Sequence, residues 1–178
     1  MAAAALAIVG VVAGCGADVE EPTVNDQDVA AIKDALYAKG TAEEEAARLE
    51  PLVIEMADGV VGVVPGLSWR WNREPLRIPC EAVPGDPGSA SALALRNVVF
   101  DGPIPDGAWP QALSVVKDVS ARVGATQLRV RVDEPGHHDV QLIGADKVQF
   151  GFGSREAAAL FAQTGCHLNL SDQDEYTN

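Results

Sequence analysis

The stretch TQLRVRVDEPGHHDVQLIGADKVQFGF, residues 126–152, decides the fold class that we expect for this chain. Three short runs within it alternate apolar and polar side chains, and turn-forming residues separate the runs. Such alternation is typical of antiparallel strands with one buried and one solvated face. The side chains expected to face the core are Leu128, Val130, Val132, Val140, Leu142, Val148, Phe150 and Phe152. The pattern therefore predicts a three-stranded antiparallel meander.

Two helices are expected near the beginning of the chain. The first begins at Asp26 and ends at Gly40, with apolar residues at helical spacing. The second begins at Thr41, which forms a capping box with Glu44. Pro51 lies inside the second pattern and removes one backbone hydrogen bond, so we expect a kink or a short break there.

The other segments predict shorter elements. Residues 74–91 hold four prolines and two glycines, and at that density we expect no regular element. The remaining elements are expected as strands at 67–72 and 93–100, helices at 106–123 and 155–164, and a short strand at 166–170. This mixture, with strands that mostly alternate on one side, predicts an α+β two-layer sandwich, an antiparallel sheet with helices packed on one face.

The first 14 residues carry no charge and have the length of a secretory signal segment. They are too few for a transmembrane helix, which needs about 20 apolar residues. Signal peptides normally begin with a basic segment, yet no Lys or Arg precedes Lys33. Either the basic segment is atypical or the true start lies upstream of Met1, and we favour the second, because a few basic residues there would complete the pattern.

The segment Val12-Ala13-Gly14-Cys15 matches a lipobox, an aliphatic residue and two small residues before a cysteine. In this interpretation the Cys15 thiol receives a diacylglyceryl group and becomes the mature N-terminus, with palmitate-type acyl chains as the membrane anchor. The alternative is a buried core cysteine. The expected organisation is a lipoprotein signal peptide at 1–14, an acylated flexible tether at 15–25, a single α+β domain at 26–170 and a polar tail at 171–178.

The two other cysteines are Cys80 and Cys166. An exported domain lies where disulfides persist, and two cysteines can form one bridge. The alternative is a metal site that they share with His167 or with the His137–His138 step, although no CxxC spacing supports it.

The formal net charge is −13. This argues against nucleic acid as a partner, because binding phosphates requires clustered Lys and Arg. It equally argues against docking on an anionic membrane through basic side chains. We therefore expect the membrane to be contacted through acylated Cys15, and we expect no cofactor.

No catalytic motif of a serine hydrolase, zinc peptidase, β-lactamase or P-loop enzyme is present in the sequence. His137-His138-Asp139 is the one histidine–carboxylate cluster, and we interpret it as a solvated hairpin end. A weak metal contact or a pH-sensitive contact is the alternative. Asp133 and Glu134 lie on the same tip, where no cleft would shift their pKa values. The sequence therefore indicates a protein that is not an enzyme.

Trp69, Trp71 and Trp109 are the three tryptophans. The first two alternate with polar residues in an expected strand, so both indoles lie on one face. We favour a core pair beneath the long helix. The alternative is a set of aromatic side chains that face an apolar ligand.

The order of several short motifs resembles one known family. After the lipobox these motifs are Pro65-Gly66, Ser68-Trp69-Arg70-Trp71, Cys80, Asn97-Val98-Val99-Phe100, Gly124-Ala125-Thr126 and Gly165-Cys166. Over about residues 26–170 the chain is similar to the LppA-type lipoproteins of mycobacteria and related actinobacteria. The resemblance implies export, acylation, a cell-envelope location and a Cys80–Cys166 bridge. It implies no activity and transfers no catalytic residues.

Three functions are compatible with these features. We expect first a lipid-anchored, non-enzymatic binding or accessory module that faces the extracytoplasmic side of the cell membrane. The second is a carrier that holds an apolar ligand between sheet and helices, in a cavity of a few hundred Å³. The third is an envelope hydrolase, which a pocket gathering His137 or His167 with carboxylates would favour.

Overall fold

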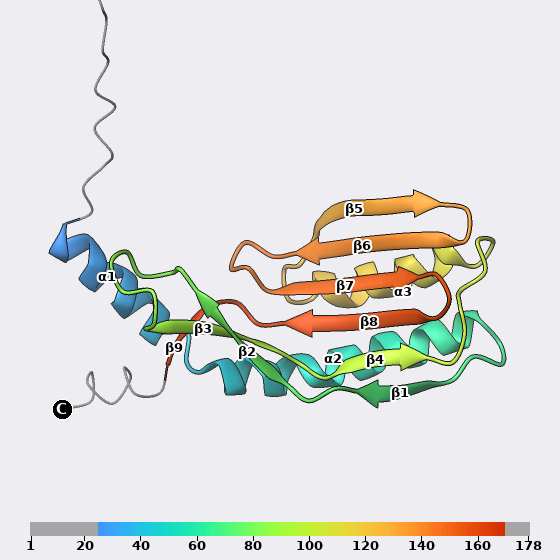
Figure 1. The fold of residues 1–178 in the computed structure, drawn as a ribbon, viewed down its shortest axis with the longest axis horizontal. Helices are drawn as coiled ribbons and strands as arrows, with labels where there is room; N and C mark the ends of the chain where they lie inside the picture. The colour runs from blue at the N-terminus through green and yellow to red at the C-terminus, as the bar shows by residue number, and fades with distance from the viewer. Residues whose placement is uncertain (1–24, 170–178) are drawn as a thin grey trace, which may run out of the picture.

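The computed structural model describes residues 25–169, which form three helices and nine strands (Figure 1). The helices are α1 (Asp26–Tyr37), α2 (Ala42–Val63) and α3 (Trp109–Ala121). The strands are β1 (Trp69–Asn72), β2 (Leu76–Cys80), β3 (Ala90–Ala94), β4 (Asn97–Phe100), β5 (Gln127–Glu134), β6 (His137–Ile143), β7 (Gln149–Ser154), β8 (Ala158–Gln163) and β9 (His167–Leu168).

All the strand pairs in the described residues are antiparallel. The main sheet has the order β1-β4-β8-β7-β6-β5 and is not closed into a barrel. The β2–β3 ladder extends from it, because β3 also pairs with β8 and β9. The α+β sandwich predicted from the sequence is confirmed.

Helices α2 and α3 cover one face of the main sheet (Figure 1). The core lies between them and includes Val53, Met56, Phe100, Phe150 and Phe152, each at most 1% exposed. The opposite face carries no helix in the described part of the chain (Figure 1). The sheet therefore has one packed face and one open face.

Helix α1 packs on a second, smaller core at the far end of the molecule (Figure 1). Leu36 of α1 meets Val83, Ala90 and Leu168 there, beside Cys80 and Cys166. The apolar face expected on α1 thus packs away from the main sheet.

Helix α2 begins as the sequence predicts. The Thr41 hydroxyl accepts from the Glu44 N–H at 3.0 Å, and the Glu44 carboxylate accepts from the Thr41 N–H at 2.9 Å. The helix then continues through Pro51, so the short break expected there does not occur. Tertiary packing of its buried face compensates for the single lost hydrogen bond.

The helix predicted at 155–164 is wrong, because this segment forms β8. Ala158, Leu160 and Ala162 are buried in alternation with more exposed neighbours, which is the period of a strand. The segment is rich in helix-forming Ala, but its position between β4 and β7 overrides that preference. Ser154 accordingly ends β7 and caps no helix.

Two further expectations need correction between residues 74 and 100. The proline-rich segment expected to be irregular contains β2, in which Pro79 is tolerated because β2 pairs only with β3. The strand expected at 93–100 is divided into β3 and β4 at Leu95-Arg96.

Helix α3 also begins later than the expected residue 106, at Trp109, and ends at Ala121. Its N-cap Ala108 makes no side-chain cap hydrogen bond. Asp106 instead accepts a hydrogen bond from the Gly136 N–H and contacts His138.

The meander at residues 127–154 forms as predicted, with two differences at its edge strand. A β-bulge between Val130 and Val132 places Val132 opposite Asp139, on the face without helices, so the prediction that Val132 faces the core is wrong. The expected core residues of β6 and β7 are buried, but Leu128 and Val130 on β5 are 39% and 53% exposed. Strand β5 is the edge strand, and the helices that cover the sheet do not bury its apolar side chains.

None of the helices in residues 25–169 is both long enough and apolar enough to span a membrane.

Candidate functional site

The most buried ionic contact of the described residues joins His167 to Glu45. His167 is 2% exposed, and its Nε2 lies 2.6 Å from Glu45 Oε2. Its Nδ1 lies 2.9 Å from the carbonyl oxygen of Gly40. Glu45 Oε2 also accepts from the Gly165 N–H at 2.9 Å. The pair therefore ties the start of α2 and the α1–α2 turn to the C-terminal end of the described chain.

Both pKa values shift toward the charged forms. Burial by itself raises the pKa of Glu45, but the hydrogen bond and charge of His167 and the Gly165 N–H bring it below its ordinary value of 4.5. Burial by itself lowers the pKa of His167, but the hydrogen bonds to Glu45 and Gly40 raise it above its ordinary 6.5. Two acceptors facing the two ring nitrogens match an imidazolium, which donates through both.

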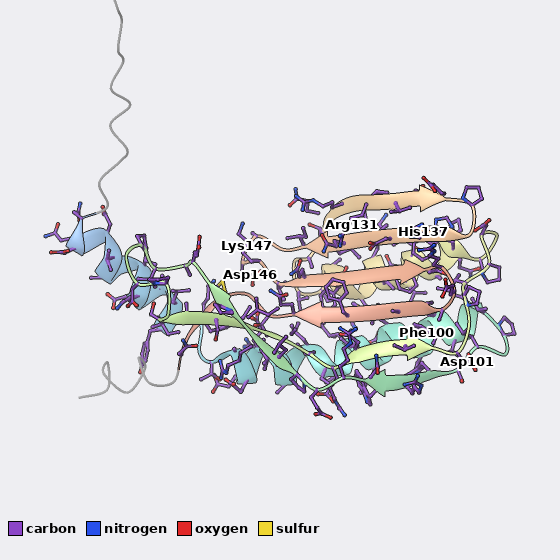
Figure 2. The ribbon with its side chains drawn as sticks, in the orientation of Figure 1. Phe100, Asp101, Arg131, His137, Asp146 and Lys147 are labelled. Carbon is purple, nitrogen blue, oxygen red and sulfur yellow. A yellow bond between two sulfur atoms is a disulfide. The ribbon has the colours of Figure 1, made fainter. Side chains whose placement is uncertain are left out.

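A small cleft of about 130 Å³ opens beside this pair. Its lining residues are Lys39, Glu45, Arg48, Asp146, Gly165 and His167. Figure 2 shows Asp146 and Lys147 in the β6–β7 turn at this end of the sheet. The cleft thus gathers His167 with two carboxylates, the arrangement that would favour a hydrolase.

The chemistry of the cleft does not supply a catalytic set. Both nitrogens of His167 are already bonded within the protein, so neither is free to take a substrate proton. The lowered pKa of Glu45 makes this carboxyl a poor general acid. The lining residues of the described cleft include no Ser, Thr or Cys nucleophile. The pair is best understood as a structural contact.

A second histidine cluster lies at the opposite end of the meander. His138 Nδ1 is 2.8 Å from Asp133 Oδ1, and Nε2 is 3.1 Å from Asp106 Oδ1. The ring stacks on Trp109 with centroids 4.6 Å apart. The pKa of Asp106 is lowered mainly by the hydrogen bond from the Gly136 N–H and, to a smaller extent, by the hydrogen bond with His138.

This cluster corrects the prediction of a solvated hairpin end. His138 is 8% exposed, because its side chain turns to the helix-covered face, while His137 on the other face is half-buried. Figure 2 shows His137 at the hairpin end of the sheet. The two imidazoles point to opposite faces, because adjacent residues of a strand do so. What the sequence did not indicate is that α3 and Asp106 cover one of them.

Strand register places Asp133, His138 and Ser154 in one row across β5, β6 and β7. This order is reminiscent of a Ser-His-Asp triad, but the contacts differ. Ser154 is 3% exposed, and its hydroxyl accepts from the Ile104 N–H at 2.8 Å. Asp106 occupies the ring nitrogen that a nucleophile would need. The row is therefore not arranged for acyl transfer.

The three tryptophans do not form one aromatic surface. Trp69 and Trp71 lie on edge strand β1 and pack partly against the main core. Trp69 donates to Asp58 of α2 at 2.8 Å, and Arg96 lies 4.4 Å from the Trp71 ring centroid. Trp109 is 6% exposed and stacks on Phe152 of β7, three strands away from β1. This packing supports the core interpretation over a shared ligand site.

Larger hollows lie elsewhere on the surface. Two of about 290 and 450 Å³ border the proline-rich segment at residues 79–91, and neither is lined by a tryptophan. They are surface hollows outside the space between sheet and helices, where an apolar carrier would hold its ligand.

Cys80 and Cys166 form a disulfide, with Cα atoms 6.1 Å apart. It attaches β2 to the segment just before β9 and closes a sequence separation of 86 residues. Cys15 lies outside the described residues. Within residues 25–169 no group of three or more His, Cys, Asp or Glu side chains is placed to hold a metal ion.

The sequence profile of LppA, described as a "lipoprotein confined to pathogenic Mycobacterium", matches residues 17–170. The chain belongs to the LppA family of lipoproteins. The family resemblance found in the sequence is thereby confirmed.

Solved structures agree with LppA membership at the level of the fold. The crystal structure of LppA from Mycobacterium tuberculosis superposes with a TM-score of 0.71 at 22% identity, covering 83% of this chain and 89% of that one. A DUF4853 family protein from Actinomyces odontolyticus gives a TM-score of 0.54 at 17% identity, covering 72% and 69%. No curated protein sequence matches the chain significantly.

In this LppA-family chain the sequence pattern does not indicate the distant partners of the two buried histidines, Glu45 for His167 and Asp106 for His138. Glu45 is the third of three consecutive glutamates at the start of α2, and nothing in the sequence distinguishes it from its neighbours. Asp106 was expected only as the first residue of a helix at 106–123. Each contact spans more than 30 residues, so only the fold brings the partners together.

Proposed function

We propose that this protein is anchored by lipid on Cys15 to the extracytoplasmic side of the cell membrane, and that it acts there by binding rather than by catalysis. Residues 1–14 would be removed as a signal peptide, and residues 15–25 would tether the folded part.

The anchor is supported by the lipobox at Val12–Cys15 and by membership of a lipoprotein family. The Cys80–Cys166 disulfide supports an exported location, because disulfides persist outside the reducing cytoplasm. The acidic composition is compatible with a lipid anchor, because acyl chains need no basic surface to hold the membrane.

The observation that carries the binding role is the open face of the main sheet (Figure 1). Helices α2 and α3 cover one face only, while both histidine–carboxylate clusters use their ring nitrogens for internal hydrogen bonds. Side chains on the open face, by contrast, remain available to a partner. A rigid, exposed sheet face suits recognition better than chemistry.

Mass spectrometry of the protein extracted from membranes of a mycobacterial host tests this proposal. The expected N-terminal peptide begins at Cys15 and carries a diacylglyceryl group. A chain that still begins upstream of Cys15, with a free thiol at that position, would overturn the proposed anchor.

A further inference from the structure

The open face of the main sheet has a distinctive composition over β5, β6, β7 and β8. Strand register places Gln127, Ile143, Gln149 and Gln163 in one row. The next row contains Arg129, Gln141, Gly151 and Phe161. These side chains alternate with buried neighbours such as Leu142, Phe150 and Ala162, so they lie on the face without helices. We call the six residues Gln127, Arg129, Gln141, Gln149, Phe161 and Gln163 the glutamine face.

Phe161 lies along the sheet over its cross-strand neighbour. A Cβ atom at Gly151 would be only 1.7 Å from Cε1 of the Phe161 ring. The ring therefore occupies the space above Gly151, and it remains half-buried with part of its surface toward solvent. An aromatic ring held in this way offers an apolar platform at the level of the sheet.

Amide groups lie on the same face as this platform and have no hydrogen-bond partner among the described residues. None of the four glutamines makes a side-chain hydrogen bond to another residue within 25–169. An amide offers two donors and an acceptor together, so each can satisfy a group that both donates and accepts. Four such unpaired amides in two adjacent rows are the chemistry that a polyhydroxylated ligand requires.

Two arginines on the open face have no acidic partner within residues 25–169. Arg129, and Arg70 on the same face of β1, are exposed and form no ion pair with other residues of the described part. Asp139, a carboxylate on this face, lies 3.6 Å from Arg131. In a chain with a net charge of −13, two unpaired arginines on the open face favour an anionic partner.

We propose that the glutamine face binds an acidic glycan of the cell envelope. The amides bond the sugar hydroxyls, the Phe161 ring packs on the apolar C–H face of one sugar, and Arg129 pairs with a carboxylate or phosphate of the glycan. From β8 to β5 the face spans about 14 Å, which fits a short oligosaccharide laid across the strands. This inference rests on the proposed function, since it names the ligand of the same open face.

Binding of defined oligosaccharides to the full chain carrying Cys15→Ala tests the proposal. Calorimetry compares tetramers of galacturonic acid, the acidic probe, and of galactose, the neutral probe, and sonicated peptidoglycan serves as a natural acidic glycan. We expect the acidic probe or peptidoglycan to bind at least about tenfold more tightly than the neutral tetramer. Arg129→Ala should remove most of that preference.

Two further variants locate the binding. Phe161→Ala and the double variant Gln141→Ala/Gln149→Ala should each weaken binding at least about tenfold. The matched control is Gln111→Ala, an exposed glutamine on α3, which should leave binding unchanged. The double variant changes only half-buried amides that make no hydrogen bond to other residues of the described chain, so it should melt as the parent does even if Phe161→Ala unfolds.

The proposal would be overturned if neither the acidic tetramer nor peptidoglycan bound more tightly than the neutral tetramer, or if none of the three bound. It would also be overturned if the double variant bound as tightly as the parent. Either result would leave the lipid anchor intact, because the mass of the N-terminal peptide reports on Cys15 alone. Conversely, an unlipidated Cys15 with intact glycan binding would overturn the anchor and not this inference.

Discussion

The His167–Glu45 contact makes the stability of this protein depend on pH in two directions. The raised pKa of His167 means that its contribution is fully present below the unfolded value of 6.5 and is lost as pH rises through the folded value. The lowered pKa of Glu45 means that its contribution is present above 4.5 and is lost as pH falls through the folded value. The pair therefore stabilises the fold most between about pH 4.5 and 6.5.

Glu45→Gln should lower the free energy of unfolding by about 3 kcal/mol within this window, because removing one partner leaves a buried charge uncompensated. The deficit should become smaller above and below the window. Urea denaturation of both proteins from about pH 4 to pH 9 measures it. Glu156→Gln, at an exposed glutamate in the β7–β8 turn, is the control and should show no such maximum. A deficit that is constant with pH would contradict the linkage.

Individual residues were predictable where their role is local. The Thr41–Glu44 capping box follows from the spacing of the two residues alone. The burial of His138 and His167 did not follow, because it depends on residues brought from distant parts of the chain. A sequence pattern contains periodicity but not the identity of such partners.

At the scale of elements, the contact between α2 and α3 depends on a glycine. A Cβ atom at Gly59 would lie 2.5 Å from Cγ1 of Val115 on α3, whereas one at Gly62, three residues later, would meet nothing within 4 Å. Substitution by alanine at Gly59 therefore tests both close packing and helix propensity, whereas the same substitution at Gly62 tests helix propensity alone.

Gly59→Ala should destabilise the protein by about 1–2 kcal/mol, because overpacking outweighs the gain of about 1 kcal/mol in helix propensity. Gly62→Ala should be neutral or stabilising by up to about 1 kcal/mol. Thermal and urea unfolding compare the two variants. Equal effects at both sites would show that α2 and α3 do not pack as closely as described.

The elements also show where sequence patterns are insufficient. The meander was predictable because its alternation is regular and its turns contain Gly or Asp. Strand β8 was not, because its Ala-rich sequence favours a helix in isolation and its strand conformation depends on pairing with β4 and β7. Strand β2 was not predicted because the segment around it is rich in proline; Pro79 within the strand is permitted only at an edge position.

At the scale of the whole molecule, the two faces of the sandwich differ in their role. The helices build the core on one side, and the other side remains open for the envelope (Figure 1). The disulfide attaches the smaller core around α1 to the end of the described chain. The sequence predicted this class of fold, the family, and through the alternation at residues 126–152 a sheet with one solvated face.

Membrane fractionation of three proteins tests the central claim, a lipid anchor at Cys15, most directly. Wild type, Cys15→Ala and the double variant Cys80→Ala/Cys166→Ala are expressed in a mycobacterial host, and membranes are washed with alkaline carbonate. We predict that wild type and the double variant remain with the washed membranes, and that Cys15→Ala moves to the soluble fraction. Retention of Cys15→Ala in the washed membranes would contradict the account.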